Sequence, residues 1–390
     1  MRVLAITNLY PNPFQPHRAP FNRHQLRILN ENHPVQVIAP ISWTDELSAR
    51  RKGLPRLPPG RSVTLDGLTV HHPLYWFPPK FGRQWYGHCY RRSIRKTFVE
   101  VVRGFRPDLV FAPWAYPDGW AAGKLAHAIG LPVVVQVHGS DILLLSRFPS
   151  RRRRTAEAVC EADGVVAVSE NLKRQLEGLG VSSKKIKVVY DGVDPALFHP
   201  GCKSASRSQL QIPSDLPVLL FVGNLVEVKA VDVLLAAMED LRKSASPCRL
   251  FAIGHGPLRA GLEAMAAKMG LAELVRFVGS ISQAELPAWY RAADVFVLPS
   301  HSEGVPNVLL EASACGTPWV ASRVGGIPEI AHLGASRLVP PGQPLELAAA
   351  IRETLGAEPS RGIAGPRSRS EAVADLTGFL LAHSNPVRDT

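Results

Sequence analysis

The sequence has few cysteines and no long hydrophobic run, and both absences narrow the kind of protein that it encodes. Its five cysteines are scattered, odd in number and without a Cys-x-x-Cys pair, which argues against a disulfide framework or a structural zinc site. No apolar stretch approaches the length of a membrane span, and the short apolar run at the start does not resemble a secretion signal. We therefore expect a cytoplasmic protein with reduced cysteines.

Two motifs of nucleotide-dependent enzymes are also missing. The loop after the first expected strand, residues 8–20, is not the glycine-rich turn of dinucleotide-binding domains, which disfavours a nicotinamide cofactor. No Asp-x-Asp pair occurs in the chain, which is consistent with chemistry that needs no metal. We expect no cofactor and no metal site.

The composition predicts a globular protein with an anionic partner. With 46% hydrophobic and 20% charged residues, a chain of 390 residues is long enough for two domains. A formal charge of +12 calls for a negatively charged partner. Two clusters hold much of this charge, namely Arg91, Arg92, Arg95 and Lys96 at helical spacing and the run Arg151, Arg152, Arg153 and Arg154. An anionic membrane surface and a merely solvated helix face both fit such clusters; no nucleic-acid-binding signature accompanies them.

Short apolar runs alternate with amphipathic helical segments along the whole chain, which predicts two α/β domains with doubly wound parallel sheets. A polar linker is expected at 200–215, so the domains are placed at 1–197 and 198–369, with a C-terminal helix within 370–390. Val63, Leu65, Leu68 and Val70 alternate around Asp66-Gly67 and predict a hairpin. The other expected strands are 2–7, 35–39, 108–111, 133–137, 164–168, 187–190, 218–222, 249–253, 275–278, 295–298 and 319–321.

The most informative stretch is PSHSEGVPNVLLEASACGTPWVASRVGG, residues 299–326. It follows an expected strand with a polar loop and a short helix, and ligands of parallel sheets bind beyond the carboxyl ends of the strands. Glu303 lies on the loop and Glu311 inside the helix. The helix start between them suits a phosphate, and the two carboxylates suit the hydroxyl groups of a ribose or a hexose. Either glutamate alone would more simply be a solvated surface acid.

Other loops at expected strand ends point the same way. Gly223-Asn224-Leu225-Val226-Glu227-Val228-Lys229 joins a glycine that permits close backbone approach to a lysine that can meet a phosphate, and Gly254 opens a second such turn. Three successive loops of this kind predict a diphosphate site. In the first half, His138 ends a central strand, and Arg18, Asn22 and Asp141 are weaker candidates for contacts with an acceptor.

The pattern EGVPNVLLEASACGTPWVAS resembles the Glu-x7-Glu motif of the retaining glycosyltransferases of family 4. The resemblance extends through RVLAITNLYP, QVHGSD, AVSENLKRQL, VVYDGVD, FVGNLVEVK and IGHGPL, and so covers most of the chain. It implies the GT-B architecture, in which two facing Rossmann-like domains enclose an interdomain cleft. The first hundred residues are similar to the subgroup that assembles cell-envelope or secreted polysaccharides.

This resemblance implies a role for each matching residue. Glu303, Lys229 and His138 would be the catalytic group, with Glu303 and His138 at the transferred sugar and Lys229 at the diphosphate. The implied donor-binding residues are Gly223, Asn224, Gly254, Ile281, Gly304, Val305, Pro306, Asn307, Val308, Leu309 and Glu311. The chain departs from the family where Asn224 replaces a common arginine, and where Ala230 and Ala19 stand at or near common glycines.

The predicted function is transfer of a hexosyl-type sugar from a nucleotide-diphosphate sugar to a saccharide or lipid-linked acceptor, with retention and without metal, at the inner face of a membrane. Two alternatives stay open from the residues. One is a phosphorylase or sugar-phosphate synthase of the same fold, and the other is a non-catalytic protein that binds nucleotide sugars or polyanions.

Overall fold

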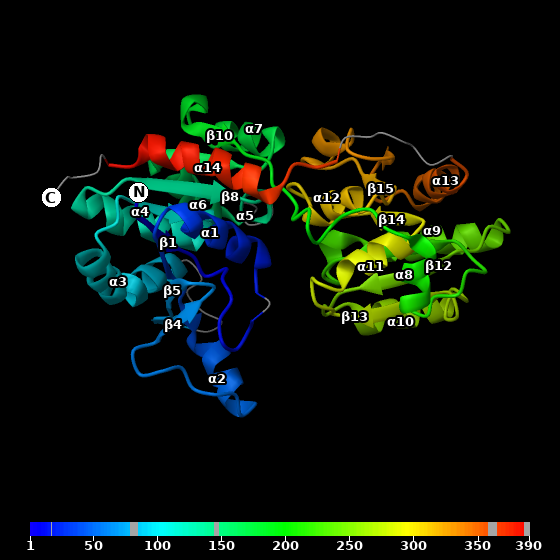
Figure 1. The fold of residues 1–390 in the computed structure, drawn as a ribbon, viewed down its shortest axis with the longest axis horizontal. Helices are drawn as coiled ribbons and strands as arrows, with labels where there is room; N and C mark the ends of the chain where they lie inside the picture. The colour runs from blue at the N-terminus through cyan, green and yellow to red at the C-terminus, as the bar shows by residue number, and fades with distance from the viewer. Residues whose placement is uncertain (17, 79–84, 144–147, 358–364, 386–390) are drawn as a thin grey trace. The chain divides into compact units, whose positions relative to one another are not determined.

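The computed structural model describes residues 1–16, 18–78, 85–143, 148–357 and 365–385, and divides them into two compact units (Figure 1). Unit 1 contains residues 1–190 and the C-terminal segment from residue 370, whereas unit 2 contains residues 191–369. The sequence places its domain boundary a few residues later, at 197. None of the helices in the described ranges combines the length and hydrophobicity that a membrane crossing needs.

Unit 1 is built on an eight-stranded sheet with the strand order β10-β9-β8-β7-β1-β2-β5-β4. All pairings in it are parallel except that of β4 with β5, which is the hairpin that the sequence predicts around Asp66-Gly67. Its strands are β1 (Val3–Ile6), β2 (Val35–Ile38), β4 (Ser62–Leu65), β5 (Leu68–His71), β7 (Leu109–Ala112), β8 (Val133–Val137), β9 (Gly164–Ala167) and β10 (Ile186–Val188). A separate two-stranded sheet pairs β3 (Ile41–Ser42) with β6 (Leu74–Tyr75).

The alternation of side chains along β1 gives unit 1 a core on each face of its sheet. Leu4 and Ile6 belong to a core closed by α3, α4, α6 and α7, whereas Val3 and Ala5 belong to a core closed by α1 and the C-terminal α14. The helices are α1 (Pro20–Asn32), α2 (Trp43–Arg51), α3 (Tyr86–Phe105), α4 (Trp120–Ala126), α5 (Ser140–Leu143), α6 (Pro149–Glu161), α7 (Glu170–Gly178) and α14 (Arg369–His383). Because β1 is buried on both faces, it reads as a continuous apolar run.

Unit 2 is built on a six-stranded parallel sheet with the order β13-β12-β11-β14-β15-β16. Its strands are β11 (Val218–Val222), β12 (Arg249–Ile253), β13 (Val275–Gly279), β14 (Val295–Leu298), β15 (Trp319–Ser322) and β16 (Ser336–Val339). Its helices are α8 (Lys203–Gln209), α9 (Val231–Lys243), α10 (Arg259–Lys268), α11 (Leu286–Ala292), α12 (Asn307–Ala314) and α13 (Pro344–Leu355). The sequence predicts each of these strands except β16.

The strand order reverses once in each parallel sheet, and this reversal fixes where a ligand can bind. In unit 2 the chain runs outward from β11 through β12 to β13, then returns to place β14 on the other side of β11. In doubly wound sheets, ligands bind in a crevice at the carboxyl ends of the two strands that flank such a reversal, which here are β11 and β14. The corresponding reversal in unit 1 lies between β1 and β7.

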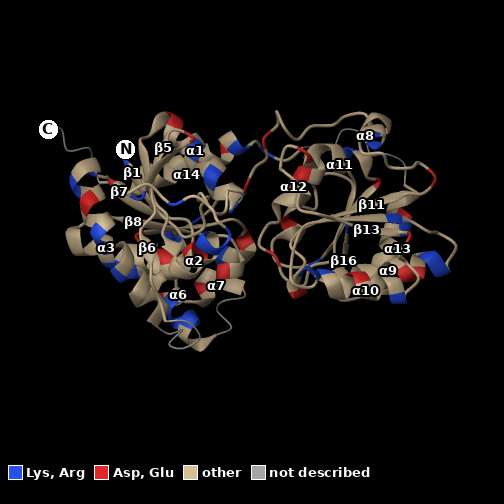
Figure 2. Ribbon diagram, turned by 90° about the horizontal axis from the view of Figure 1, so that it is seen from below, with Lys and Arg blue, Asp and Glu red and all other residues tan. Residues whose placement is uncertain are grey.

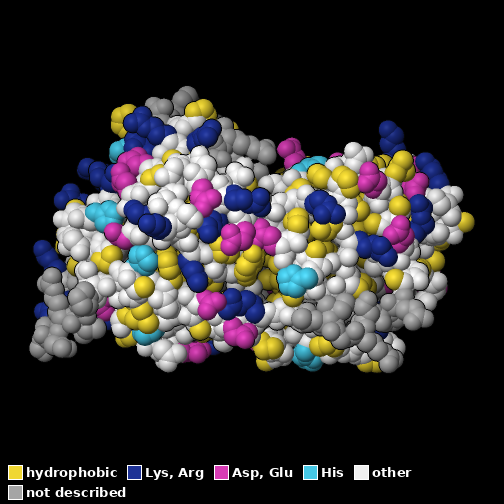
Figure 3. All heavy atoms as spheres, turned by 90° about the horizontal axis from the view of Figure 1, so that it is seen from above, with side chains coloured by type: hydrophobic (Ala, Val, Ile, Leu, Met, Phe, Trp, Pro, Cys, Tyr) yellow, Lys and Arg dark blue, Asp and Glu magenta, His cyan; other side chains and the backbone are white. Residues whose placement is uncertain are grey.

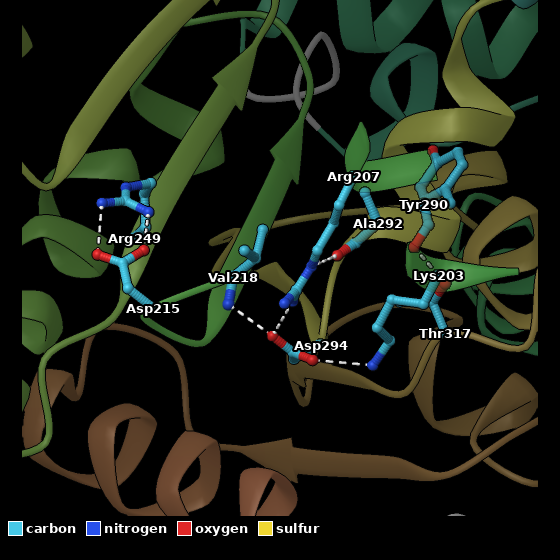
Figure 4. Close-up of polar contacts among 9 residues, drawn as sticks. All are labelled: Lys203, Arg207, Asp215, Val218, Arg249, Tyr290, Ala292, Asp294 and Thr317. Carbon is cyan, nitrogen blue, oxygen red and sulfur yellow. Dashed lines mark hydrogen bonds and ion pairs between the residues drawn. The ribbon is translucent and has the colours of Figure 1, made fainter. Parts of the chain in front are cut away.

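The interpretation of residues 200–215 as a plain linker is wrong, because this stretch contains α8. The helix packs against α11 and is anchored by Asp294, which precedes β14 (Figure 4). The Asp294 carboxylate accepts from Lys203 Nζ at 2.8 Å and from Val218 N at 2.7 Å, and it pairs with the Arg207 guanidinium. These contacts join residues far apart in the sequence, so local pattern does not reveal them.

Two of the alanines in the described ranges hold left-handed backbone conformations at helix starts. Ala19 precedes α1 with φ 45°, and Ala230 precedes α9 with φ 48°. An L-residue with a Cβ atom loses about 1–2 kcal/mol there, whereas glycine does not. The backbone thus keeps a shape that glycine adopts more easily, at two places where the sequence lacks it.

We predict that Ala19→Gly raises the free energy of unfolding by about 0.5–1 kcal/mol, because relief of the left-handed conformation exceeds the extra chain entropy of glycine. Urea denaturation measures the change. Ala162→Gly is the control, since Ala162 follows α6 with φ −58° and gains nothing from glycine. Equal losses of stability in both variants would contradict the assignment.

Candidate functional site

Unit 2 brings the sequence-predicted donor residues to one edge of its sheet. They lie on the loops that follow four adjacent strands in the order β13, β12, β11 and β14, and they converge on the strand reversal. Ile281 follows β13, Gly254 follows β12, and Gly223, Asn224 and Lys229 follow β11. The loop after β14 carries Glu303 to Pro306, and α12 carries Asn307, Val308, Leu309 and Glu311.

An ion pair spans the crevice between the loops after β11 and β14. Lys229 Nζ lies 2.6 Å from Glu303 Oε1, and the two side chains are 19% and 12% exposed. The backbone joins the same loops, because His301 N donates to Val228 O at 2.8 Å. A lysine and a carboxylate in this position give the crevice one cation for a phosphate and one acceptor for hydroxyl groups.

The N-terminus of α12 opens between the two glutamates. Pro306 stands at its N-cap, and within the described residues no side chain caps the helix or places an acid in its first turn. Asn307 Oδ1, at this end, is buried without a hydrogen-bond partner among the described residues, and so is Ser300 Oγ, which lies just after β14. The unpaired backbone N–H groups and the helix dipole suit an anion here.

Glu311 is buried inside α12 and is held from a neighbouring helix. It is 6% exposed, and its Oε2 accepts a hydrogen bond of 2.8 Å from the Tyr290 hydroxyl on α11. Burial raises the pKa of Glu311 to about 7, while the bond from Tyr290 and the charge of Arg369 act in the opposite direction. The carboxylate is therefore poised between its charged and neutral forms near neutral pH.

Glycine is required where these loops approach one another. A Cβ atom on Gly254, whose φ is 142°, would lie 1.9 Å from Gly223 O, and one on Gly325 would lie 1.8 Å from Glu303 O. Both distances are far below any contact that a real Cβ makes. The loops after β11 and β12, and those after β14 and β15, therefore hold their positions by direct backbone packing.

In unit 1, His138 lies at the end of β8 among aromatic rings. Its ring is stacked near Trp114 at 6.4 Å and contacts Phe21 at 4.8 Å. Its Nε2 is buried without a hydrogen-bond partner among the described residues, and burial lowers its pKa to about 4. His138 is therefore neutral at neutral pH and can position a hydroxyl group, but it supplies no positive charge.

The three acceptor-side candidates all make contacts within unit 1. Asp141 is fully buried, and its Oδ1 accepts from the backbone N–H of His138 and Gly139, at 3.1 and 3.0 Å. Arg18 donates to Gln15 at 2.6 Å, and Asn22 Nδ2 donates to Leu9 O at 2.8 Å. Asp141 thus shapes the loop that carries His138, while Asn22 keeps a buried Oδ1 that lacks a partner in the described residues.

Asp118 is a buried carboxyl that the sequence reasoning misses. It lies beyond β7 and accepts from Thr7 Oγ1 at 3.2 Å and Asn8 N at 3.0 Å, so it bridges the strand reversal of unit 1. Burial raises its pKa to about 7. In the sequence it sits in Pro117-Asp118-Gly119, which is typical of an exposed turn. Only its place after a buried strand could have suggested a site.

The two basic clusters flank one tryptophan. Arg91 on α3 and Arg154 on α6 lie 6.0 and 5.0 Å from the ring centre of Trp120. Figure 2 shows Lys and Arg positions in blue on both helices. Arg154 is also paired with Glu157 at 2.7 Å, while Arg92, Arg95 and Lys96 line a shallow groove of about 550 Å³ along α3. On the face drawn in Figure 3, by contrast, Lys and Arg side chains are interspersed with Asp and Glu.

Two α/β units with parallel sheets, one of which gathers a lysine, a carboxylate and an uncapped helix start at its strand reversal, are typical of glycosyltransferases of the GT-B architecture. Residues 203–370 match the family described as Glycosyl transferases group 1, and residues 13–197 match Glycosyltransferase Family 4. The D-inositol 3-phosphate glycosyltransferase 1 of Catenulispora acidiphila is 30% identical over 84% of this chain and 81% of its own length. The chain belongs to glycosyltransferase family 4.

Other similar proteins agree with this assignment. The putative teichuronic acid biosynthesis glycosyltransferase TuaC of Bacillus subtilis is 29% identical over 90% of this chain and 88% of its own. The solved structure of Anabaena Alr3699/HepE with UDP and glucose shares the fold, with a TM-score of 0.74, 18% identity, and coverage of 98% of this chain and 100% of that one. The chain spans about half the length of the first curated relatives that it matches.

We predict that Gly254→Ala destabilises unit 2 by more than 2 kcal/mol or abolishes nucleotide binding, because its Cβ has no space beside Gly223 O. Thermal unfolding and titration with nucleoside diphosphates measure the two effects. Gly261→Ala on α10 is the control, since its Cβ meets open space and a helix favours alanine. A Gly254→Ala variant that folds and binds like Gly261→Ala would refute the packing argument.

The raised pKa of Asp118 predicts a dependence of stability on pH. The unfolded carboxyl ionises near pH 4 and the folded one near 7, so the folded state loses stability as the pH rises through this window. Asp118→Asn cannot ionise, so its unfolding free energy relative to wild type should rise by up to about 4 kcal/mol between pH 4 and 8. Denaturation at several pH values measures this, with the exposed Asp232→Asn as the control for a lost charge. A difference that stays constant with pH would be the contrary result.

Proposed function

We propose that the protein is a retaining, metal-independent glycosyltransferase that moves a hexosyl group from a nucleotide-diphosphate sugar to a saccharide or lipid-linked acceptor. The observation that carries this proposal is the Lys229–Glu303 pair astride the strand reversal, beside an uncapped helix start and ahead of the buried Glu311. The similarity to a protein named for teichuronic acid biosynthesis supports an acceptor of the bacterial envelope or an exopolysaccharide.

The donor roles follow from the chemistry of each group. Glu311 is set back from the helix start and, when ionised, can accept hydrogen bonds from the two ribose hydroxyls. The backbone at Gly304 to Leu309 and the Lys229 ammonium hold the diphosphate, with donors from N–H groups before Leu309, because Pro306 has none and Leu309 N donates to Pro306 O at 3.0 Å. Ile281, half-buried beyond β13, packs against the base.

Catalysis in this proposal is stabilisation of the leaving diphosphate. Breaking the anomeric bond places negative charge on the β-phosphate, and Lys229 with the helix start is oriented toward that charge before the reaction begins. A phosphate oxygen then accepts the proton of the acceptor hydroxyl, which attacks from the same face of the sugar. Glu303 and neutral His138 position the sugar hydroxyls.

Asn224 changes the charge of this site. It is exposed beside Gly223, where family members commonly have arginine, so Lys229 and the helix dipole carry more of the diphosphate charge than usual. Glu303 also neutralises Lys229 in the free protein, so an arriving diphosphate competes with this carboxylate for the ammonium. Both features favour a donor that binds weakly until its sugar engages Glu303.

Unit 1 is proposed to rest on an anionic membrane surface, where a lipid-linked acceptor would be found. Val99, which is 38% exposed, lines the same groove as the exposed cations of α3, and Trp85, which is 59% exposed, immediately precedes this helix. Cationic and aromatic side chains together suit the headgroup region. The protein would then bind from the inner face of the membrane without spanning it.

Turnover tests the donor site. A thermal-shift panel of UDP-, GDP- and ADP-sugars selects the donor, and release of nucleoside diphosphate from it is then measured. We expect Lys229→Ala and Glu303→Ala each to lower the rate about 10²- to 10³-fold, as the loss of a preorganised charge does elsewhere. Lys243→Ala, which removes an exposed lysine paired within α9, is the control.

Near-normal turnover in the site variants would refute the assignment of the donor site. A wild type that binds a nucleotide sugar without releasing nucleoside diphosphate would favour a pure binding protein.

Vesicle binding tests the membrane surface. Because each basic residue near an anionic surface contributes about 1 kcal/mol, the triple change Arg92→Ala, Arg95→Ala and Lys96→Ala should weaken binding to phosphatidylglycerol vesicles about 100-fold at low salt. The control removes the same charge elsewhere in unit 1, through Arg174→Ala, Lys184→Ala and Lys187→Ala. Sedimentation with vesicles measures both. Equal weakening of vesicle binding in the two triple variants, or no binding of wild type at low salt, would exclude this surface.

A further inference from the structure

The carboxylate of Glu311 is oriented by a side chain outside the Glu-x7-Glu motif. The Tyr290 hydroxyl, which comes from α11, donates to Glu311 Oε2 over 2.8 Å, and Tyr290 is fully buried. A buried carboxylate is costly unless donors satisfy it, so this bond stabilises the charged form and fixes the direction of its lone pairs.

The surroundings of Tyr290 leave its hydroxyl little choice of direction. Its ring packs against Phe296 at 5.5 Å and Phe198 at 6.1 Å. Its backbone carbonyl accepts from Thr317 Oγ1 at 2.7 Å, and Arg207 Nε donates to Ala292 O at 3.0 Å, which secures the end of the same helix (Figure 4). The core and the two hydrogen bonds thus aim the Tyr290 hydroxyl at Glu311.

Other ionisable and polar groups also face Glu311. Arg369 lowers the pKa of the Glu311 carboxyl by its charge, and Gln283 does so by a hydrogen bond, against the larger upward effect of burial. Burial also raises the pKa of the nearby Cys315 thiol, to about 12, and raises that of Tyr290 well above its usual value. Both therefore stay neutral at ordinary pH, and Tyr290 acts as a hydrogen-bond donor.

We propose that Tyr290 is a positioning residue for donor recognition, which holds the Glu311 carboxylate in the orientation that accepts the ribose hydroxyls. This inference rests on the proposed function, because it requires Glu311 to meet a ribose. An ionised carboxylate can accept from the two hydroxyls with both of its oxygens, whereas a protonated one donates from one oxygen and is a weaker acceptor. Tyr290 therefore also determines the pH above which the site distinguishes ribose from 2′-deoxyribose.

The test compares UDP, GDP and ADP with their 2′-deoxy counterparts. Calorimetric titration from pH 6 to 9 gives the ratio of the two dissociation constants for each pair. For a nucleotide that binds wild type, we expect the deoxy form to bind about 10-fold more weakly at high pH, and this preference to fade as the pH falls through about 7.

Three variants separate positioning from structure. In Tyr290→Phe the preference should appear only at a pH at least one unit higher, because the lost donor no longer opposes the effect of burial. It should stay smaller than that of wild type even at pH 9, because the ionised carboxylate has lost the bond that orients it. Glu311→Gln should show a small preference that does not change with pH. Thr317→Val is the matched control, because it removes the bond to the Tyr290 carbonyl but spares the Tyr290 hydroxyl. Its midpoint, which is the pH at which the preference for ribose is half of its maximum, should equal that of wild type even where its melting temperature falls.

The outcomes distinguish this inference from the proposed function. If wild type binds none of these nucleotides, the proposed function fails and the inference fails with it. If wild type discriminates but folded Tyr290→Phe keeps the same midpoint, or loses affinity equally for both sugars at every pH, only the positioning role is overturned. A wild type that binds without discrimination shows that Glu311 does not meet the 2′-hydroxyl, and this also overturns the role.

Discussion

The ion pair between Lys229 and Glu303 is the interaction on which the candidate site depends. It joins the loops after β11 and β14, which are adjacent only because the strand order reverses between them. Both side chains are largely buried, so removal of either would leave a charge that is poorly solvated. The pair keeps the crevice neutral and shaped while it is free, and it offers a cation once a phosphate arrives. In the proposed enzyme, this balance prepares the site for negative charge.

Backbone packing holds the rest of the crevice in place. Gly254 and Gly325 let neighbouring loops approach to distances that no side chain tolerates. At Ala19 and Ala230 the chain keeps left-handed backbone conformations without glycine, which is a local cost that the surrounding fold sustains. Packing around the sheets therefore fixes the shape of these loops, and single residues adopt the backbone conformation that it requires.

Much of the fold could be predicted because buried parallel strands leave apolar runs in the sequence. The expected bounds of β8, β11, β12 and β14 agree with the structure, and so does the hairpin of β4 and β5. β16 was not predicted, because an edge strand with the sequence Ser-Arg-Leu-Val has too few apolar residues to stand out. α8 was not predicted, because the ion pair that holds it, between Arg207 and Asp294, joins residues that are far apart in the sequence. Patterns report burial well, but they do not report long-range polar pairs.

The same limit applies to the site. The loops of the site could be predicted from the motif and the strand order, but the hydrogen-bond partners of the buried carboxyls could not. The sequence around Tyr290 does not indicate a bond to Glu311, and the sequence around Asp118 does not indicate a bond to Thr7. Asp141 shows the converse, because a residue that looks available for an acceptor holds the backbone of its own loop. Roles assigned by spacing alone therefore need the hydrogen bonds of the folded chain beside them.

A crystal structure with the selected nucleotide sugar bound tests the central claim most directly. We expect the diphosphate at the start of α12, within hydrogen-bond distance of Lys229 Nζ and of backbone N–H groups between Gly304 and Val308, with the ribose hydroxyls on Glu311. A nucleotide bound elsewhere, or a diphosphate turned away from α12 while Lys229 stays paired with Glu303, would contradict it.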